Sequence, residues 1–210
     1  NYDVVEIDKD TAGVTSFVDH AFTIQLAIDF VETEATGYVN VDMDVYINGK
    51  LCAEKVFTNC QSSYFGNYLA IDRYETGASI IVDNVNVGES DPEDPEQTTD
   101  VIEVEGFTNI SVVDFVDASG NAMESKEYAY TMNPTTRDSF QLKEGMDYDK
   151  KLLSFKVDFK KPGNTEGSKG SCIHFAGAAD WQGFWMNPHD SGDKLQIVSH
   201  SAYTGDDNYD

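Results

Sequence analysis

The side chains best suited to chemistry in this sequence are two tryptophans and the polar stretch that follows them. Trp181 and Trp185 flank Phe184, and residues 187–193, NPHDSGD, add amide, imidazole and carboxylate groups. Tryptophan faces stack on sugar rings, and neighbouring polar groups hydrogen-bond to sugar hydroxyls. We therefore predict a glycan-binding site with these candidate residues: Trp181, Phe184, Trp185, Asn187, His189 and Asp190. The alternative is that the aromatic residues fill the interior of the fold or an interface.

Closely spaced acidic residues are the second feature to consider. A glycoside hydrolase needs two carboxylates on one face, a few ångströms apart, as nucleophile and acid/base. Three acidic pairs with one residue between them are candidates, namely Glu32 and Glu34, Asp42 and Asp44, and Glu103 and Glu105. None of these pairs is joined by a third carboxylate at the spacing of a catalytic set, so they fit better on the solvent face of strands and turns. We predict no catalytic residues and no enzyme activity.

Basic and metal-binding residues indicate no further site. Arg73 and Arg137 are the only arginines, and neither lies in a recognisable motif. The histidines are His20, His174, His189 and His200. They lack the i, i+2 or i, i+4 spacing that zinc sites often show. His20 and His174 are expected to pack in strands.

The segments that carry the candidate residues, and most of the rest of the chain, are predicted to form strands. Residues 39–47 alternate apolar and polar side chains, and residues 22–30 do the same. Asn48-Gly49 follows the first of these runs, and this dipeptide favours the type I′ turn of a hairpin whose second strand begins at Lys50 and ends at Val56. Further strands are predicted at 68–73, 151–159, 171–177, 183–188 and 194–200, the last three as a meander. The apolar stretch 101–116 is predicted to begin a second run of strands, and residues 8–13 are predicted to form a polar turn. The sequence thus predicts an all-β fold.

The order of three segments resembles a known family. HAFTIQLAIDF (20–30), VYINGKL (45–51) and IIVDNVNV (80–87) are similar in order and spacing to the closing half of a laminin-G-like or concanavalin A-like jelly roll. The resemblance implies an antiparallel jelly-roll β-sandwich. It also implies a structural Ca²⁺ near Asp83 and Asn84, with Glu103 or Asp114 as partner ligands, because carboxylate and amide oxygens suit this ion. The alternative at Asp83 and Asn84 is an ordinary strand end.

Residues 88–100, GESDPEDPEQTTD, differ sharply from their surroundings. They contain two prolines, several acids and no large apolar residue, which is typical of an extended linker. Residues 1–87 resemble the C-terminal half of a laminin-G-like sandwich, and residues 101–210 resemble its N-terminal half. We therefore expect a chain cut in mid-domain, in which 1–87 of the same or a neighbouring chain completes 101–210.

The two ends of the chain carry the same tripeptide. Asn1-Tyr2-Asp3 begins the sequence, and Asn208-Tyr209-Asp210 ends it. This match supports the hypothesis that the chain is one unit of a tandem repeat or a homopolymer. The alternative is that separate subunits exchange halves of their sandwiches.

Charge and cysteine content narrow the partners and the compartment. The formal net charge is −24, from 38 acidic and 14 basic residues, and such a charge repels nucleic acid. No segment has the length of apolar sequence that membrane insertion requires. Cys52 and Cys60 are close enough in sequence for a disulfide typical of extracellular proteins, although two reduced thiols fit equally well, and Cys172 is expected to be a buried thiol.

These observations lead to three ranked hypotheses. The first is a noncatalytic, Ca²⁺-stabilised repeat module of a secreted or cell-surface protein, which acts in assembly and adhesion with neighbouring copies of itself. The second is a lectin-like carbohydrate-binding module that uses the tryptophan cluster. The third is a glycoside hydrolase or polysaccharide lyase.

Overall fold

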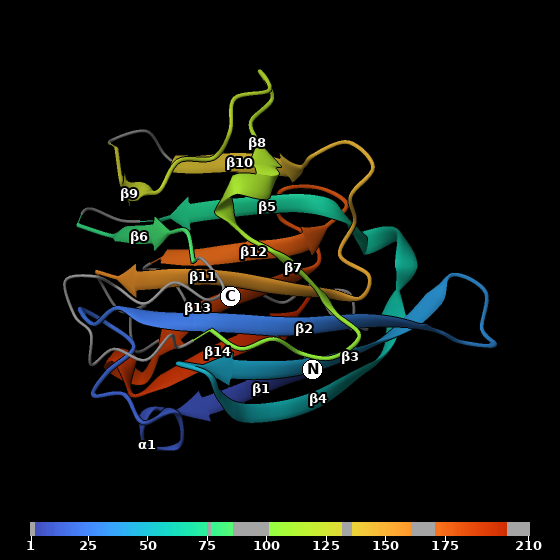
Figure 1. Cartoon of the computed structure of the whole chain (residues 1–210), viewed down its shortest axis with the longest axis horizontal. Helices are drawn as coiled ribbons and strands as arrows, with labels where there is room; N and C mark the ends of the chain where they lie inside the picture. Colours follow the sequence, from blue (N-terminus) through green and yellow to red (C-terminus); the bar gives the residue numbers. More distant parts are fainter. Residues whose placement is uncertain (1–2, 75–76, 86–100, 132–135, 161–170, 201–210) are drawn as a thin grey trace, which may run out of the picture.

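Two stacked antiparallel β-sheets form the protein, as the computed structural model shows for residues 3–74, 77–85, 101–131, 136–160 and 171–200 (Figure 1). The first sheet has the order β1 (Asp3–Asp8), β14 (Lys194–Ser199), β13 (Phe184–His189), β12 (Ser171–Gly177), β5 (Phe65–Arg73), β10 (Thr136–Leu142), β8 (Phe115–Val116). The second has the order β4 (Lys50–Gln61), β3 (Tyr38–Ile47), β2 (Phe22–Glu32), β11 (Lys151–Phe159), β6 (Ser79–Asp83), β9 (Lys126–Ala129). The all-β prediction is confirmed, and the architecture is a β-sandwich.

Short elements complete the described chain. β7 (Thr108–Ile110) pairs in parallel with β11, unlike the antiparallel strand pairs of both sheets. Four single-turn helices are described, namely α1 (Lys9–Ala12), η1 (Ser62–Tyr64), η2 (Val112–Asp114) and η3 (Asp190–Gly192). The sequence predicts only a polar turn where α1 forms, and Gly13 ends this helix with a φ of 73°.

Strands from both sides of residues 88–100 are mixed within each sheet. In the first sheet, β5 lies between β12 and β10, and in the second, β11 lies between β2 and β6. The strands of 3–85 and 101–200 therefore build one sandwich within a single chain, with one hydrophobic core between the sheets. β1 and β14, the first and last described strands, are antiparallel neighbours, and Asp3 lies opposite Ser199. The predicted linker at 88–100 is outside the described residues.

The hairpin of β3 and β4 has the turn at Asn48-Gly49 that the sequence predicts. Asn48 and Gly49 have φ values of 48° and 72°, as a type I′ turn requires. The Asn48 side chain also accepts a hydrogen bond from the backbone N–H of Thr23, at 2.8 Å. The partner strand β4 continues to Gln61 rather than ending at Val56.

Of the two alternatives for Cys52 and Cys60, the structure has the reduced thiols and not the disulfide. Both residues lie on β4, and the structure has thiols at both positions. Eight residue-to-residue steps along an extended strand place their Cα atoms about 26 Å apart. A disulfide needs a Cα separation of roughly 4.4–6.8 Å. A bond between these cysteines would therefore require the strand to be taken apart.

The segment 101–116 forms less strand than its apolar sequence predicts. Residues 101–107 run across the outer face of the second sheet, over β2 and β11, before β7 pairs with β11 (Figure 1). At Ile102, the Gln25 side chain makes the hydrogen bonds that the backbone of a neighbouring strand would otherwise make. It accepts from Ile102 N at 2.8 Å and donates to Ile102 O at 3.0 Å. The segment is thus held by side-chain bonds rather than by a long strand ladder.

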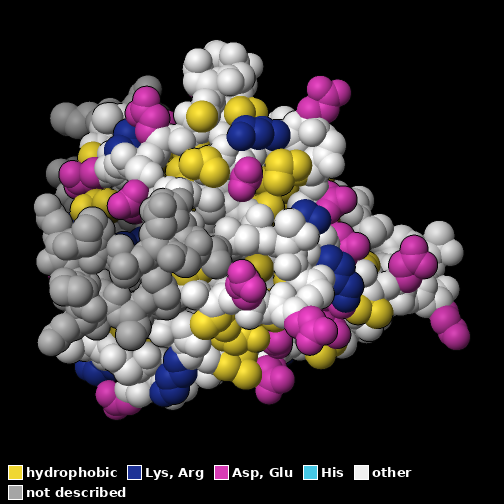
Figure 2. All heavy atoms as spheres, viewed as in Figure 1, with side chains coloured by type: hydrophobic (Ala, Val, Ile, Leu, Met, Phe, Trp, Pro, Cys, Tyr) yellow, Lys and Arg dark blue, Asp and Glu magenta, His cyan; other side chains and the backbone are white. Residues whose placement is uncertain are grey.

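The acidic excess is spread over the surface. In Figure 2, the acidic side chains are scattered across the visible face rather than gathered in one patch. This distribution fits the solvated surface of a highly charged protein. In the part of the chain that the structure describes, no helix has the length and apolar character to cross a membrane.

Candidate functional site

The outer face of the first sheet carries a group of polar residues beside the core. Strand residues point alternately to the two faces, so Ile71 in β5 packs in the core while Asp72 points outward. Likewise, Ile173 in β12 packs in the core, while Cys172 and His174 point outward. The alternation therefore places Asp72, Cys172 and His174 on one face.

Strand register brings these residues together from distant parts of the sequence. Asp72 lies directly opposite Arg137 of β10 on one side and Cys172 of β12 on the other. His174, two residues after Cys172, lies opposite the small residue Ala70. A row of charged and thiol side chains thus crosses three adjacent strands.

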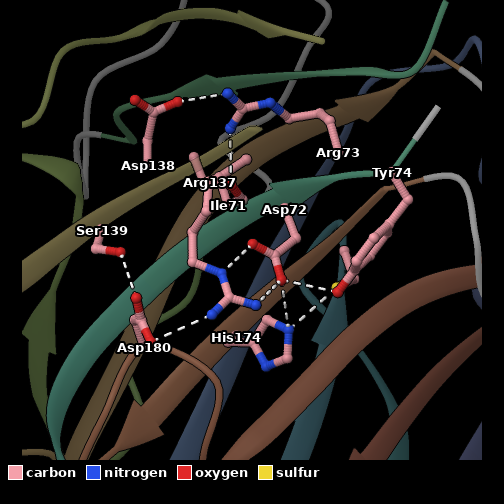
Figure 3. A network of polar contacts seen from close by, with 10 residues as sticks. Ile71, Asp72, Arg73, Tyr74, Arg137, Asp138, Ser139, His174 and Asp180 are labelled. Atoms are coloured by element: carbon pink, nitrogen blue, oxygen red, sulfur yellow. Dashed lines mark hydrogen bonds and ion pairs between the residues drawn. The ribbon is translucent and has the colours of Figure 1, made fainter. Parts of the chain in front are cut away.

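Asp72 is the centre of this network (Figure 3). Arg137 binds its carboxylate through two parallel hydrogen bonds, from Nε at 2.5 Å and from Nη2 at 2.6 Å. Tyr74 donates its hydroxyl to Asp72 Oδ2 at 2.8 Å, and His174 Nε2 lies 3.1 Å from the same oxygen. The Asp72 side chain is 1% exposed, so these contacts stabilise a carboxylate that is almost fully removed from water.

The contacts shift the pKa values of the two partners in opposite directions. Burial raises the pKa of Asp72, but hydrogen bonds from His174 and Arg137 outweigh it and lower this pKa to about 2. Burial lowers the pKa of His174, but the neighbouring Cys172 and Asp72 outweigh it and raise this pKa to about 9. At neutral pH, Asp72 is therefore ionised and His174 is protonated.

Cys172 and Tyr74 complete the cluster. The Cys172 sulfur lies 3.3 Å from His174 Nε2 and 3.7 Å from the Tyr74 hydroxyl oxygen. Burial raises the pKa of Tyr74, and the nearby Cys172 and Asp72 raise it further, so the phenol stays protonated. His174 Nε2 faces both Asp72 and Cys172, whereas its Nδ1 is buried without a hydrogen-bond partner.

A second ion pair lies one residue away on the same two strands. Arg73 donates to Asp138 Oδ2 at 2.6 Å and to the backbone oxygen of Ile71 at 2.7 Å (Figure 3). Strand alternation directs Arg73 and Asp138 to the face opposite Asp72 and Arg137. This pair is therefore separate from the outward-facing cluster.

Aromatic side chains form a wall beside the cluster. The ring centroids of Trp185 and His200 are 4.1 Å apart, and those of Trp181 and His200 are 6.2 Å apart. Burial and the positive charges of His174 and Arg137 lower the pKa of His200 to about 3, so this ring is neutral. Trp181 is 46% exposed. The wall and the cluster enclose a pocket of about 210 Å³, lined by Tyr74, Arg137, Cys172, His174, Trp181, Trp185 and His200.

A tight loop between β12 and β13 positions Asp180 and Trp181. A side chain at Gly177 would lie 2.4 Å from the backbone oxygen of Ala179, and one at Gly183 would lie 2.4 Å from that of Phe175. Only glycine allows this close backbone approach. The loop holds Asp180 against Arg137 Nη1 at 3.2 Å, at the rim of the pocket.

The structure separates the residues that the sequence proposes for glycan binding. Trp181 and Trp185 line the pocket. Phe184 does not: it is fully buried in the core against Phe57 and Phe175, so its inclusion was wrong. Asn187 is 1% exposed. His189 ends β13, about 13 Å along the strand from Trp185, and the Asp190 side chain is outside the described residues.

The proposed calcium ligands lie elsewhere. Asn84 Oδ1 accepts from the Ser111 hydroxyl at 2.7 Å, and Asp114 Oδ2 accepts from the Ser111 backbone N–H at 3.0 Å. Asp83 bonds to the backbone N–H of Asn84 at 2.8 Å. Glu103 lies on a hollow of about 640 Å³ whose wall is mainly the segment 102–109. Calcium binding by these residues stays a prediction.

Most of the cluster was missed by sequence reasoning. One signal was present: Cys172 and His174 are two residues apart in an apolar strand, so both point to one face. The participation of Asp72 and Arg137 depends on a strand order that the sequence does not reveal.

In comparisons with known proteins, no protein-family model, no curated protein and no solved structure matches this chain.

Proposed function

We propose that this chain is a noncatalytic carbohydrate-binding module, built on a laminin-G-like or concanavalin A-like jelly roll, that binds a sugar at the pocket between Trp181 and Arg137. The single observation that carries this proposal is the combination of an exposed tryptophan wall with a polar, charged floor in one pocket. Aromatic rings supply stacking surface for the apolar face of a sugar, and the floor supplies hydrogen-bonding groups for its hydroxyls.

The size of the pocket limits the ligand. Drug-sized ligands occupy pockets of roughly 300–1,000 Å³. The volume of about 210 Å³ is smaller, and it suits one sugar ring or the end of a chain. The exposed edge of Trp181 would then contact the next unit outside the pocket.

The bonding within the pocket favours binding over turnover. Arg137, Tyr74 and His174 meet here, although no sequence motif connects them. A lyase needs a base that can accept a proton, but the Tyr74 phenol donates to Asp72 and its pKa is raised. A glycoside hydrolase needs a protonated carboxylic acid, but the pKa of Asp72 is lowered to about 2. Both groups are held in states that do not suit these reactions.

The test is a glycan array followed by calorimetric titration of the best ligand. Trp181→Ala should weaken binding at least tenfold, because it removes the most exposed stacking surface of the pocket. Tyr38→Ala is the matched control, since Tyr38 is a similarly exposed aromatic residue, 42% exposed, on β3 of the other sheet. An equal loss in both variants, or an array without any ligand, would count against the proposal.

The first hypothesis from the sequence involves a different surface. Assembly with neighbouring copies, a secreted or surface location and calcium stabilisation remain predictions, and electron microscopy of the protein can examine the first of them. The tryptophan pocket gives the carbohydrate-binding hypothesis the more specific support.

A further inference from the structure

Four donor atoms converge at the floor of the pocket. They are Asp72 Oδ2, Tyr74 Oη, Cys172 Sγ and His174 Nε2, and neighbouring atoms among them are 2.8, 3.1, 3.3 and 3.7 Å apart. The Asp72, Cys172 and His174 atoms all lie within 4.8 Å of one another. In the part of the chain that the structure describes, this is the one group of at least three His, Cys, Asp or Glu residues with such spacing.

The geometry points to a zinc-binding site in which Asp72, Cys172 and His174 are ligands and Tyr74 stands at the fourth corner. Zinc bonds of 2.0–2.3 Å in a tetrahedron place neighbouring ligand atoms about 3.3–3.7 Å apart. The separations of His174 Nε2 from Asp72 Oδ2 and from Cys172 Sγ, at 3.1 and 3.3 Å, lie close to this range, and Asp72 and Cys172 lie within 4.8 Å of each other. An ion between the three ligand atoms therefore requires adjustment of the side chains and no rearrangement of the strands.

The mixture of donors selects the metal. Thiolate and imidazole ligands suit zinc, whereas calcium and magnesium take oxygen ligands almost exclusively. A thiolate and a carboxylate together neutralise the charge of Zn²⁺. Metal ligands bind in their deprotonated forms, so zinc competes with protons for this site.

The bonding around His174 argues against a nucleophilic Cys–His–Asp relay. In such a relay, one ring nitrogen contacts the thiol and the other contacts the carboxylate. Here Nε2 faces both Cys172 and Asp72, while Nδ1 is buried without a partner. A single atom that faces two other donor atoms is the arrangement expected when all three share one cation.

Three features of the surroundings fit a metal site. Arg137 holds the Asp72 carboxylate through two hydrogen bonds, as outer groups commonly hold metal ligands in place. The ligand side chains are buried, at 1%, 4% and 6% exposure for Asp72, Cys172 and His174. The pocket between Trp181 and Arg137 provides an entry path from solvent.

The test uses the whole chain after chelator treatment. Titration with ZnCl₂ in excess Mg²⁺, which occupies surface carboxylates, should give one tightly bound Zn²⁺ per chain. Titration with Co²⁺ should produce a sulfur-to-cobalt charge-transfer absorption band, which reports directly on a thiolate ligand. Zinc that binds only without Mg²⁺, or a cobalt spectrum without the sulfur band, would overturn the proposal.

Matched cysteine variants locate the site. Cys172→Ser should abolish the sulfur band and weaken zinc binding by more than the ~10–100-fold that changes to outer groups cost. Cys52→Ser, which changes a thiol on β4 of the other sheet, should leave both unchanged. Circular dichroism will establish that each variant folds, and Tyr74→Phe tests the fourth corner with less disturbance. If Cys52→Ser has the effect expected of Cys172→Ser, the proposed location is wrong.

The zinc test is independent of the glycan proposal. Trp181→Ala should lose glycan affinity but keep the zinc stoichiometry, because Trp181 contributes no ligand atom. Failure of the zinc titration would therefore leave the carbohydrate-binding proposal standing, and the reverse also holds.

Discussion

Both sheets bury polar side chains on their outer faces, but they satisfy them in different ways. On the second sheet, Gln25 and Ser154 are 0% exposed and lie beneath the segment 101–110. Gln25 binds both backbone groups of Ile102, and Ser154 donates to Asn109 at 2.5 Å. On the first sheet, the Asp72 cluster borders a pocket, and His174 Nδ1 has no hydrogen-bond partner.

The difference separates a polar layer that the chain covers from one that it leaves beside a pocket. The chain covers the face of the second sheet with its own backbone, whose donors and acceptors complete the bonding of Gln25 and Ser154. The face of the first sheet is bordered by Trp181 and Trp185 instead, and it keeps charged groups next to solvent. A ligand or an ion can therefore reach the Asp72 cluster through the pocket without displacing part of the fold.

The largest expected effect follows from Asp72→Asn. The substitution removes the negative charge that compensates Arg137 and His174 in a nearly buried site. Removing one partner of a buried ion pair typically costs about 3–5 kcal/mol of unfolding free energy. Urea unfolding, performed with chelator present so that bound metal does not contribute, will measure the loss. A change below about 1 kcal/mol would show that the network contributes little to stability.

The sequence predicts the structure of the two outer faces to different extents. Alternation in 22–30 and 151–159 correctly predicts β2 and β11, and the Asn48-Gly49 dipeptide correctly predicts the turn between β3 and β4. The covering segment was predicted as strands, because its apolar residues resemble those of a strand. The sequence does not show that Gln25, far away in the chain, supplies its hydrogen bonds.

The cluster was harder to predict for a topological reason. Asp72, Arg137 and His174 come from strands that are adjacent only because β5 inserts between β10 and β12. Two other differences have local causes. Phe184 and Trp185 are consecutive strand residues, so they must face opposite sides, and only one of them can reach the pocket. The disulfide alternative depended on a strand that ends at Val56, whereas β4 continues to Gln61.

An intermediate effect is expected from Gln25→Leu on the covered face. Leucine leaves the Ile102 N–H and C=O without their side-chain partner, and an unsatisfied buried polar group costs about 1–3 kcal/mol. Hydrogen exchange should show faster exchange at the Ile102 amide. Zinc and glycan binding should be unchanged, because Gln25 lies on the other sheet. Loss of either binding activity would break the proposed division between the two faces.

The smallest effect is expected at Glu6, which tests whether burial or polar pairing gives the cluster its strength. Glu6 lies on β1 and accepts hydrogen bonds from Gln196 at 2.6 Å and Lys194 at 3.2 Å. These bonds lower its pKa below the ordinary value of 4.5. A lowered pKa in the folded state stabilises the protein above the pKa of the unfolded state, and this contribution is lost as the pH falls through the folded value.

The pH dependence of Glu6→Gln therefore has a defined sign. The difference in unfolding free energy between wild type and Glu6→Gln should be a few tenths of a kcal/mol at pH 7, because solvent screens exposed pairs. It should shrink as the pH falls below about 4.5. Asp72 receives similar bonds but is buried, so the loss from Asp72→Asn should be several times larger and should persist to lower pH. Equal losses in the two variants would mean that pairing alone, irrespective of burial, accounts for the stability of the cluster.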